Sequence, residues 1–165
     1  SRVLKWDMPK DFTTLEYLPE PLKQPSKAPL DLYATSRSLL GKHLTLDDSI
    51  PPELGCAQAL SAILLKCGYP IPKKGISTVA GLTDWMLSNG FQEVMEYRKG
   101  LVITGRAPDW AHIGITGTTH IMSNTSYTIT FKELVEGLWK ANYKRASWYT
   151  EFPIVKLFTP PPTAS

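Results

Sequence analysis

The sequence predicts an α+β fold in one domain, with helices first along the chain and antiparallel strands after them. A chain of 165 residues with 42% hydrophobic residues is long enough for a single core. Residues 56–67 are apolar on nearly every face and are followed by Gly68, which is typical of a central buried helix. After Gly90 the helical spacing gives way to short runs separated by turn residues, which indicates strands.

Three helices are expected before residue 90. Residues 31–40 place apolar side chains on one face and stop at Gly41, and the apolar helix of residues 56–67 stops at Gly68. A third helix is expected to begin at Ser77 as N-cap and to end at Asn89-Gly90. Its expected buried side consists of Val79, Leu82, Trp85, Met86 and Leu87.

Short strands are expected in the second half, joined by tight turns. The predicted strands cover residues 91–97, 101–104, 111–116 and 119–124, and Gly117-Thr118 is the expected hairpin turn between the last two. A further helix is predicted over residues 131–143, with Thr130 as its cap, and a last strand over residues 148–157.

Both ends of the chain are rich in proline. Residues 1–30 contain five prolines, which interrupt any helix, so we expect an extended arm over the domain or a contact to a partner. Residues 31–158 form the expected domain. Residues 159–165 form a proline-rich tail.

The composition argues against several classes of protein. The sequence contains no apolar stretch of about 18 residues, so it predicts no transmembrane helix. Residues 1–10 also lack the apolar core of a signal peptide. No basic run alternates with aromatic residues, so nucleic-acid binding has no support. A net charge of +3 suits either an acidic polymer, such as a bacterial cell wall, or ordinary solubility.

The two cysteines are predicted to be free thiols. Cys56 and Cys67 lie on one expected helix, about 16 Å apart at the rise of an α-helix, which is too far for a disulfide or a shared metal site. Cys67 comes late in the helix and is expected to pack as a small hydrophobic residue.

Cys56 is the candidate nucleophile. The partial positive charge and free N–H groups of a helix start favour a thiolate, and Gly55 lets a substrate approach the backbone closely. Two groups are candidates to hold an oxyanion: the free N–H groups at this helix start, which include that of Ala57, and the side chain of Gln58. The alternative is that Cys56 is only a small buried side chain.

His112 is the candidate base. It stands in Trp110-Ala111-His112-Ile113-Gly114-Ile115, where a strand among small and apolar residues would hold and shield its imidazole. His43 lies in a loop before the cysteine helix and is expected to be solvated.

A third polar group is expected on the following strand. Strand alternation places His120, Met122 and Asn124 on one face. The Asn124 carbonyl is the preferred acceptor for the imidazole N–H, with His120 as the alternate. The plainer alternatives are that Asn124 only ends the strand and that His120 is an exposed turn residue.

In their order and spacing, several short motifs together resemble phage and prophage cysteine hydrolases related to the CHAP and NlpC-type peptidoglycan hydrolases, within the papain-like superfamily. The similarity covers residues 31–158. It rests on Gly55-Cys56-Ala57-Gln58 before an apolar helix, Ile76-Ser77-Thr78, a Leu-x-x-Trp helix, Phe91-x-x-Val94, Ala111-His112-Ile113-Gly114-Ile115 and Ile121-Met122-Ser123-Asn124-Thr125-Ser126.

The resemblance implies a papain-like fold, in which a central helix that begins with the nucleophile packs on an antiparallel sheet. It implies an endopeptidase or amidase that cleaves amide bonds in peptidoglycan, with Cys56 as nucleophile, His112 as base and Asn124 as orienting residue, and with no cofactor or metal. Such a protein would be made in the cytoplasm and act at the cell wall, either alone as an endolysin or as part of a virion. The arm of residues 1–30 would then dock onto phage structural proteins, such as those of a tail.

Two positions depart from the family pattern. Arg98-Lys99-Gly100 stands where the family usually has a Pro-Gly-Asp-like turn, and Ala111 precedes the histidine where glycine is common, so we expect a cleft of different shape. Two other functions stay open at this point. One is a non-catalytic structural or binding module of a phage particle, and the other is an acyltransferase or a protease acting on proteins.

Overall fold

The computed structural model describes residues 29–130 and 133–162. The predicted arm lies almost entirely outside these residues, as do the end of the proline-rich tail and the first two residues of the helix predicted over 131–143. The unit formed by residues 30–162 is described by itself.

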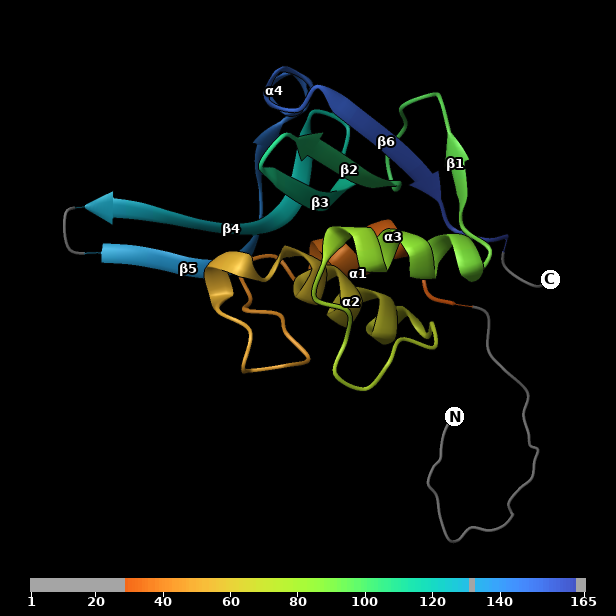
Figure 1. Ribbon diagram of the computed structural model, residues 1–165, viewed down its shortest axis with the longest axis horizontal. Helices are drawn as coiled ribbons and strands as arrows, with labels where there is room; N and C mark the ends of the chain where they lie inside the picture. The colour runs from red at the N-terminus through yellow and green to blue at the C-terminus, as the bar shows by residue number, and fades with distance from the viewer. Residues whose placement is uncertain (1–28, 131–132, 163–165) are drawn as a thin grey trace, which may run out of the picture. The chain divides into compact units, whose positions relative to one another are not determined.

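The described residues form an α+β fold, as the sequence predicted, with one six-stranded antiparallel sheet (Figure 1). The strand order is β1-β6-β2-β3-β4-β5. The helices are α1 (Leu32–Ser38), the 3-10 helix η1 (Pro52–Leu54), α2 (Cys56–Cys67), α3 (Val79–Ser88) and α4 (Arg145–Glu151). The strands are β1 (Gln92–Val94), β2 (Val102–Ala107), β3 (Trp110–Thr116), β4 (His120–Thr130), β5 (Glu133–Lys144) and β6 (Ile154–Thr159).

Helices α1, α2 and α3 lie on one side of the sheet, and α4 lies on the other (Figure 1). Helix α2 is the most buried of them: Leu60, Ile63 and Leu64 have no exposed surface. It ends at Gly68, whose φ of 106° is favourable for glycine and lets the chain turn away from the helix. The helix that carries Cys56 is thus fixed in the core, as expected.

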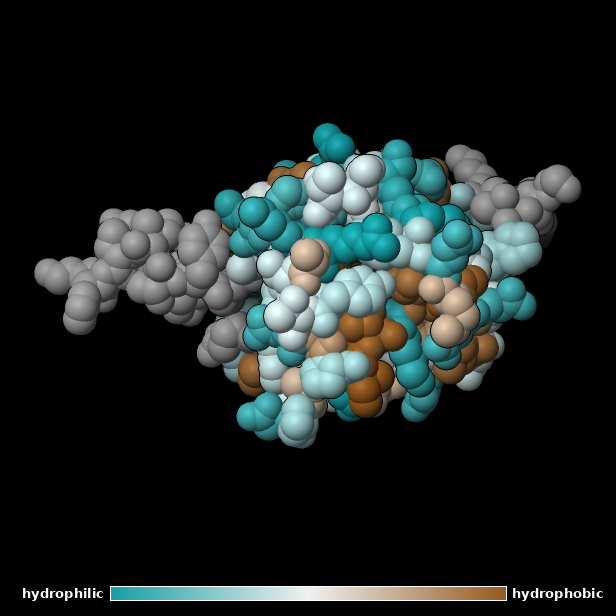
Figure 2. Space-filling view, turned by 90° about the horizontal axis from the view of Figure 1, so that it is seen from above, coloured by the Kyte–Doolittle hydropathy of each residue, from teal (hydrophilic) through white to brown (hydrophobic). Residues whose placement is uncertain are grey.

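A second hydrophobic cluster covers the opposite face, beneath α4. Its fully enclosed members include Ile103 of β2 and Trp148 of α4. Seen from the α4 side, hydrophobic and hydrophilic residues are interspersed over the described surface (Figure 2). Trp110, Tyr149 and Ile154 are among the large apolar side chains that remain exposed.

The predictions for α3 are correct in extent but not in detail. The N-cap is Thr78, whose hydroxyl accepts from the Gly81 N–H, rather than Ser77. Leu87 points outward and is 51% exposed, contrary to expectation, whereas Val79, Leu82 and Met86 are buried.

The predicted helix over residues 131–143 is wrong. Residues from Glu133 onward form β5, which pairs with β4 along its length, for example Asn124 with Trp139. The predicted strand over 148–157 is also wrong in its first half. Residues Arg145–Glu151 form α4, and β6 begins only at Ile154.

The Gly117 turn is confirmed, because the Gly117 N–H donates to the His120 carbonyl across the β3–β4 hairpin. No helix among the described residues has both the length and the apolar character needed to cross a bilayer.

Candidate active site

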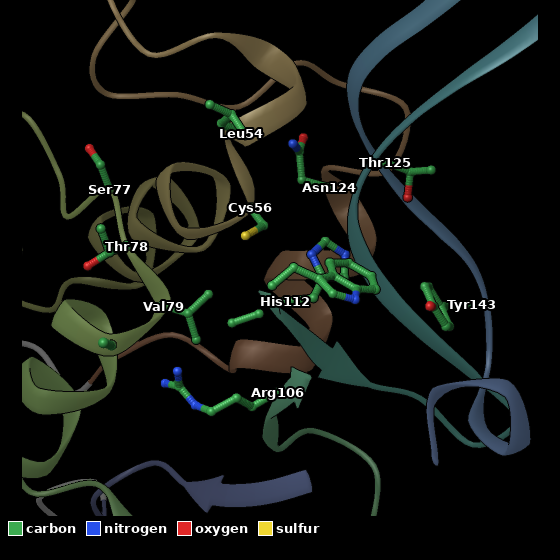
Figure 3. Close-up of a pocket in the computed structure, with 13 residues that line it drawn as sticks. Leu54, Cys56, Ser77, Thr78, Val79, Arg106, His112, Asn124, Thr125 and Tyr143 are labelled. Carbon is green, nitrogen blue, oxygen red and sulfur yellow. The ribbon is translucent and has the colours of Figure 1, made fainter. Parts of the chain in front are cut away.

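Three residues predicted from the sequence line one pocket of about 720 Å³. Cys56 is the first residue of α2, His112 lies on β3 and Asn124 lies on β4. In Figure 3 the Cys56 sulfur and the His112 ring face the same open space, with Leu54 and Asn124 beside it. The fold therefore brings together side chains that are up to 68 positions apart in the sequence.

Cys56 sits at a helix start that has no side-chain cap, so the first N–H groups of α2 are left for other partners. The N–H groups of Ala57, Ile113 and Cys56 itself approach the sulfur and favour its anionic form, but burial outweighs them and raises the pKa of the thiol. The resting group at neutral pH is therefore a thiol, with helix N–H groups already in place around it.

Gly55 allows the tight turn from η1 into α2. A side chain at this position would meet the Pro52 carbonyl oxygen at 3.2 Å and the Asn124 amide nitrogen at 3.4 Å. The absence of a side chain thus lets the segment before the nucleophile pack against β4.

The His112 imidazole is packed among aromatic rings. Trp148 stacks on it at a centroid distance of 5.3 Å, and the rings of Trp110 and Tyr143 follow at 5.9 and 6.2 Å. Desolvation by this burial lowers the pKa of His112 to about 4. The imidazole is therefore uncharged at neutral pH and, in the free protein, is a weaker base than an ordinary histidine.

The candidate nucleophile and base are neighbours across the pocket rather than a preformed ion pair. Among the described residues, no hydrogen bond joins the Cys56 thiol to the His112 imidazole. Free enzymes often hold such pairs at longer distance and tighten them when substrate binds. The arrangement can thus support proton transfer from sulfur to nitrogen during attack on a carbonyl.

Asn124 contacts the loop that leads to the nucleophile. Its Nδ2 donates a 3.0 Å hydrogen bond to the Pro52 carbonyl, which lies in η1. No hydrogen bond between Asn124 and His112 is seen among the described residues. The structure thus brings Asn124 to the pocket as predicted, and it shows an anchoring contact to η1 in place of the expected contact to the imidazole.

The alternate third residue, His120, is not part of this pocket. It sits beside the β3–β4 turn, where its Nδ1 lies 2.9 Å from the Thr119 hydroxyl, and it lines a separate cavity with Tyr33 and Arg37. His120, the alternate third residue, therefore does not line the pocket that Cys56 and His112 share. His43 is exposed, as expected, and its Nδ1 lies 3.1 Å from the Gly137 carbonyl oxygen.

The side-chain amide of Gln58, which the sequence offers as a candidate to hold an oxyanion, makes hydrogen bonds within the fold. Its Oε1 accepts from the Leu46 N–H at 2.8 Å, and its Nε2 donates to the Lys74 carbonyl and to the Ser77 hydroxyl, both at 2.9 Å. Both acceptors of the Gln58 amide nitrogen therefore lie within the protein, and one of them, Ser77, lines the pocket. Of the two predicted oxyanion donors, the Ala57 N–H is the one placed beside the sulfur.

Several pocket residues were not predicted from the sequence. Tyr143 was assigned to a helix, and Arg106 stood in a turn region without a motif. Trp110, which is 43% exposed at the pocket, carried no signal beyond its place next to the strand of His112.

The described residues contain no group of three or more His, Cys, Asp or Glu side chains able to hold a metal ion. Cys56 and Cys67 are both free thiols, as expected. Comparison of the chain with protein-family models, curated proteins and solved structures gave no match.

Proposed function

We propose that the chain is a papain-like cysteine hydrolase that cleaves amide bonds in bacterial peptidoglycan, either in a peptide or at the sugar–peptide junction. The observation that carries this proposal is the shared pocket of Cys56, at the start of a buried helix, and His112, an uncharged imidazole on the adjacent sheet. A thiol next to a general base at a helix start is the usual arrangement of a cysteine nucleophile.

The first half of the reaction forms a thioester. The Cys56 sulfur attacks the amide carbonyl carbon while the His112 imidazole takes the thiol proton. The carbonyl oxygen becomes an oxyanion, which the Ala57 N–H at the start of α2 stabilises. The intermediate collapses, the carbon–nitrogen bond breaks, and the leaving amine takes the proton back from the imidazolium.

The second half consumes water. The neutral His112 imidazole removes a proton from a water molecule, and the resulting hydroxide attacks the thioester carbonyl. The carbon–sulfur bond then breaks, which releases a carboxylic acid and returns the proton to the Cys56 sulfur. No external oxidant or cofactor takes part in these steps.

The shape of the site supports a substrate that reaches it from the surface. Leu54 and Trp110, which both line the pocket, are 65% and 43% exposed. The choice of peptidoglycan rests on the resemblance of the motifs around Cys56 and His112 to cell-wall hydrolases. The arrangement of α2 against an antiparallel sheet supports the papain-like part of the proposal.

The test is mass spectrometry of fragments released from defined, purified peptidoglycan. We expect the wild-type chain to release fragments with new amine and carboxylate ends, and Cys56→Ala to release none while keeping its fold. Cys67→Ala is the matched control, because it removes the other thiol of the same helix, away from the pocket. Equal release by wild type and Cys56→Ala would overturn the assignment of the nucleophile.

One observation favours a non-catalytic alternative, in which the module binds within a phage particle. Burial raises the pKa of the Cys56 thiol, so it is not poised as a thiolate in the free protein. On this alternative, wild type and Cys56→Ala would sediment equally with insoluble peptidoglycan or with a phage particle, and neither would release fragments. The fragment assay above therefore separates the two functions.

A further inference from the structure

Arg106 is a charged residue in the lining of the Cys56 pocket. It lies on β2, where it pairs with Ala111 of β3 and Ile154 of β6. Figure 3 shows its side chain extending from β2 toward Val79 of α3. None of the other lining residues is Asp, Glu or Lys. They are Leu54, Cys56, Ser77, Thr78, Val79, Ala80, Trp110, Ala111, His112, Asn124, Thr125 and Tyr143.

Arg106 is an exposed residue, and no charged partner of its side chain lies within the described part of the chain. No ion pair or hydrogen bond of its guanidinium is found there. A second, smaller cavity of about 80 Å³ adjoins the pocket at Val79 and Arg106, which line both, and Lys156 of β6 also lines it. Arg106 therefore lines both cavities and Lys156 lines only the smaller one, and no described carboxylate is paired with Arg106.

We propose that Arg106, with Lys156 behind it, forms a carboxylate-binding subsite of the Cys56 pocket. This inference rests on the proposed hydrolase function and specifies its substrate: a peptide with a free carboxylate near the amide that is cleaved. A guanidinium presents two parallel N–H donors that match a carboxylate. A carboxamide at the same place offers one acceptor and no charge, so the site would discriminate against it.

Arg106 lies outside the group of rings that surrounds the candidate base. Its expected role is therefore to bind part of the substrate and not to take part in the reaction. It belongs to the strand next to His112, while the aromatic rings around the imidazole come from β3, β5 and α4. A carboxylate held near Val79 would place the rest of the peptide across Cys56. The subsite would thus set the direction in which a stem peptide lies in the pocket.

The first test measures local charge without any hydrolysis. Iodoacetate and iodoacetamide alkylate thiols by the same chemistry, but only iodoacetate is negative. The ratio of their rates at Cys56, followed by peptide mass spectrometry, is expected to fall about three- to tenfold in Arg106→Gln, since a unit charge a few ångströms away has this effect at a partly solvated site. Arg98→Gln is the matched control, because it removes the same charge outside the pocket and should leave the ratio unchanged.

The second test uses paired peptides that differ only in a carboxylate or a carboxamide beside the scissile bond. Wild type should prefer the carboxylate by about 10- to 100-fold in kcat/KM, and Arg106→Gln should lose most of that preference. A preserved alkylation ratio in Arg106→Gln, or an equal fall in Arg98→Gln, would overturn the subsite. A fallen ratio with no hydrolysis of either peptide would keep the subsite and overturn the hydrolase function.

Discussion

The Trp148 indole stacks on the His112 imidazole, with ring centroids 5.3 Å apart and planes inclined by 28°. Trp148 has no exposed surface, and its indole nitrogen has no hydrogen-bond partner among residues 29–130 and 133–162. The ring that faces the candidate base is thus fully enclosed by the protein. This contact explains why desolvation is the cause that holds the pKa of His112 near 4.

Folding stability is predicted to fall as the pH drops from about 6.5 to about 4. In this range the unfolded chain protonates His112, whereas the folded protein resists protonation, so acid favours unfolding. The difference of about 2.5 pKa units amounts to at most about 3 kcal/mol. Urea unfolding at pH 7, 5.5 and 4.5 checks this, and His112→Gln should flatten the pH dependence.

The matched control for that prediction is His120→Gln. It removes a histidine that lies outside the pocket, on the β3–β4 hairpin, without touching the aromatic cluster. The acid instability that burial of His112 causes should remain in this variant. An unchanged slope in His112→Gln would mean that another group causes the acid instability.

Replacement of the stacking ring is predicted to move the pH profile of the reaction. Trp148→Phe keeps an aromatic ring but leaves space for water near His112, so the pKa of the imidazole should rise toward its usual value. The acid limb of kcat/KM against pH should then move to higher pH than in wild type. Tyr149→Phe, an exposed neighbour on the same helix, is the control and should not move the limb.

The hydrogen bond from Asn124 to the Pro52 carbonyl, just before Cys56, is predicted to contribute to both the stability of the fold and the rate of the reaction. Asn124→Ala removes the hydrogen bond to the Pro52 carbonyl and should cost about 1 kcal/mol, since Gly55 still donates to that carbonyl. Asn124→Asp should cost more, because a carboxylate oxygen would face the carbonyl oxygen. Thermal unfolding of the two variants gives the order.

Kinetics of Asn124→Ala separate the two roles of this residue. If Asn124 anchors η1, kcat/KM falls while the acid limb of the pH profile stays in place, because the surroundings of His112 do not change. A shifted limb would instead support the orienting role that the sequence predicted for Asn124.

Gln58 is predicted to stabilise the fold and to leave the chemistry alone. Gln58→Leu keeps the size of the side chain but leaves the Leu46 N–H and the Lys74 carbonyl without this partner, at a cost of about 3 kcal/mol. Denaturant unfolding should show this loss, whereas the exposed Gln92→Leu should show almost none. Below its unfolding temperature, Gln58→Leu should retain near-normal kcat, which an oxyanion donor would not allow.

The sequence predicted the part of the site that depends on local patterns. The apolar run and Gly68 define α2, and with it the place of Cys56 at the helix start. Alternation and turn residues define β3 and the beginning of β4, which carry His112 and Asn124. These features follow from the period of the chain and from its glycines.

The predictions from the sequence were wrong where pairing between distant segments decides the secondary structure. Leu134, Val135, Leu138 and Trp139 are spaced as on a helix, yet this segment pairs with β4 as a strand, and Gly137 adopts a φ of 58°. Helix α4 begins after Lys144 without a side-chain cap, so it has no start signal. The aromatic surroundings of His112 arise from these two segments and were therefore missed.

The most direct measurement of the central claim is the mass of the protein itself during turnover. The wild-type chain is mixed with peptidoglycan fragments, quenched in acid within the first turnovers, and analysed intact and after digestion. The proposed mechanism predicts an acyl group attached to Cys56, absent in Cys56→Ala and unchanged in Cys67→Ala. Release of fragments with no acyl group on Cys56, or with one on Cys67, would contradict it.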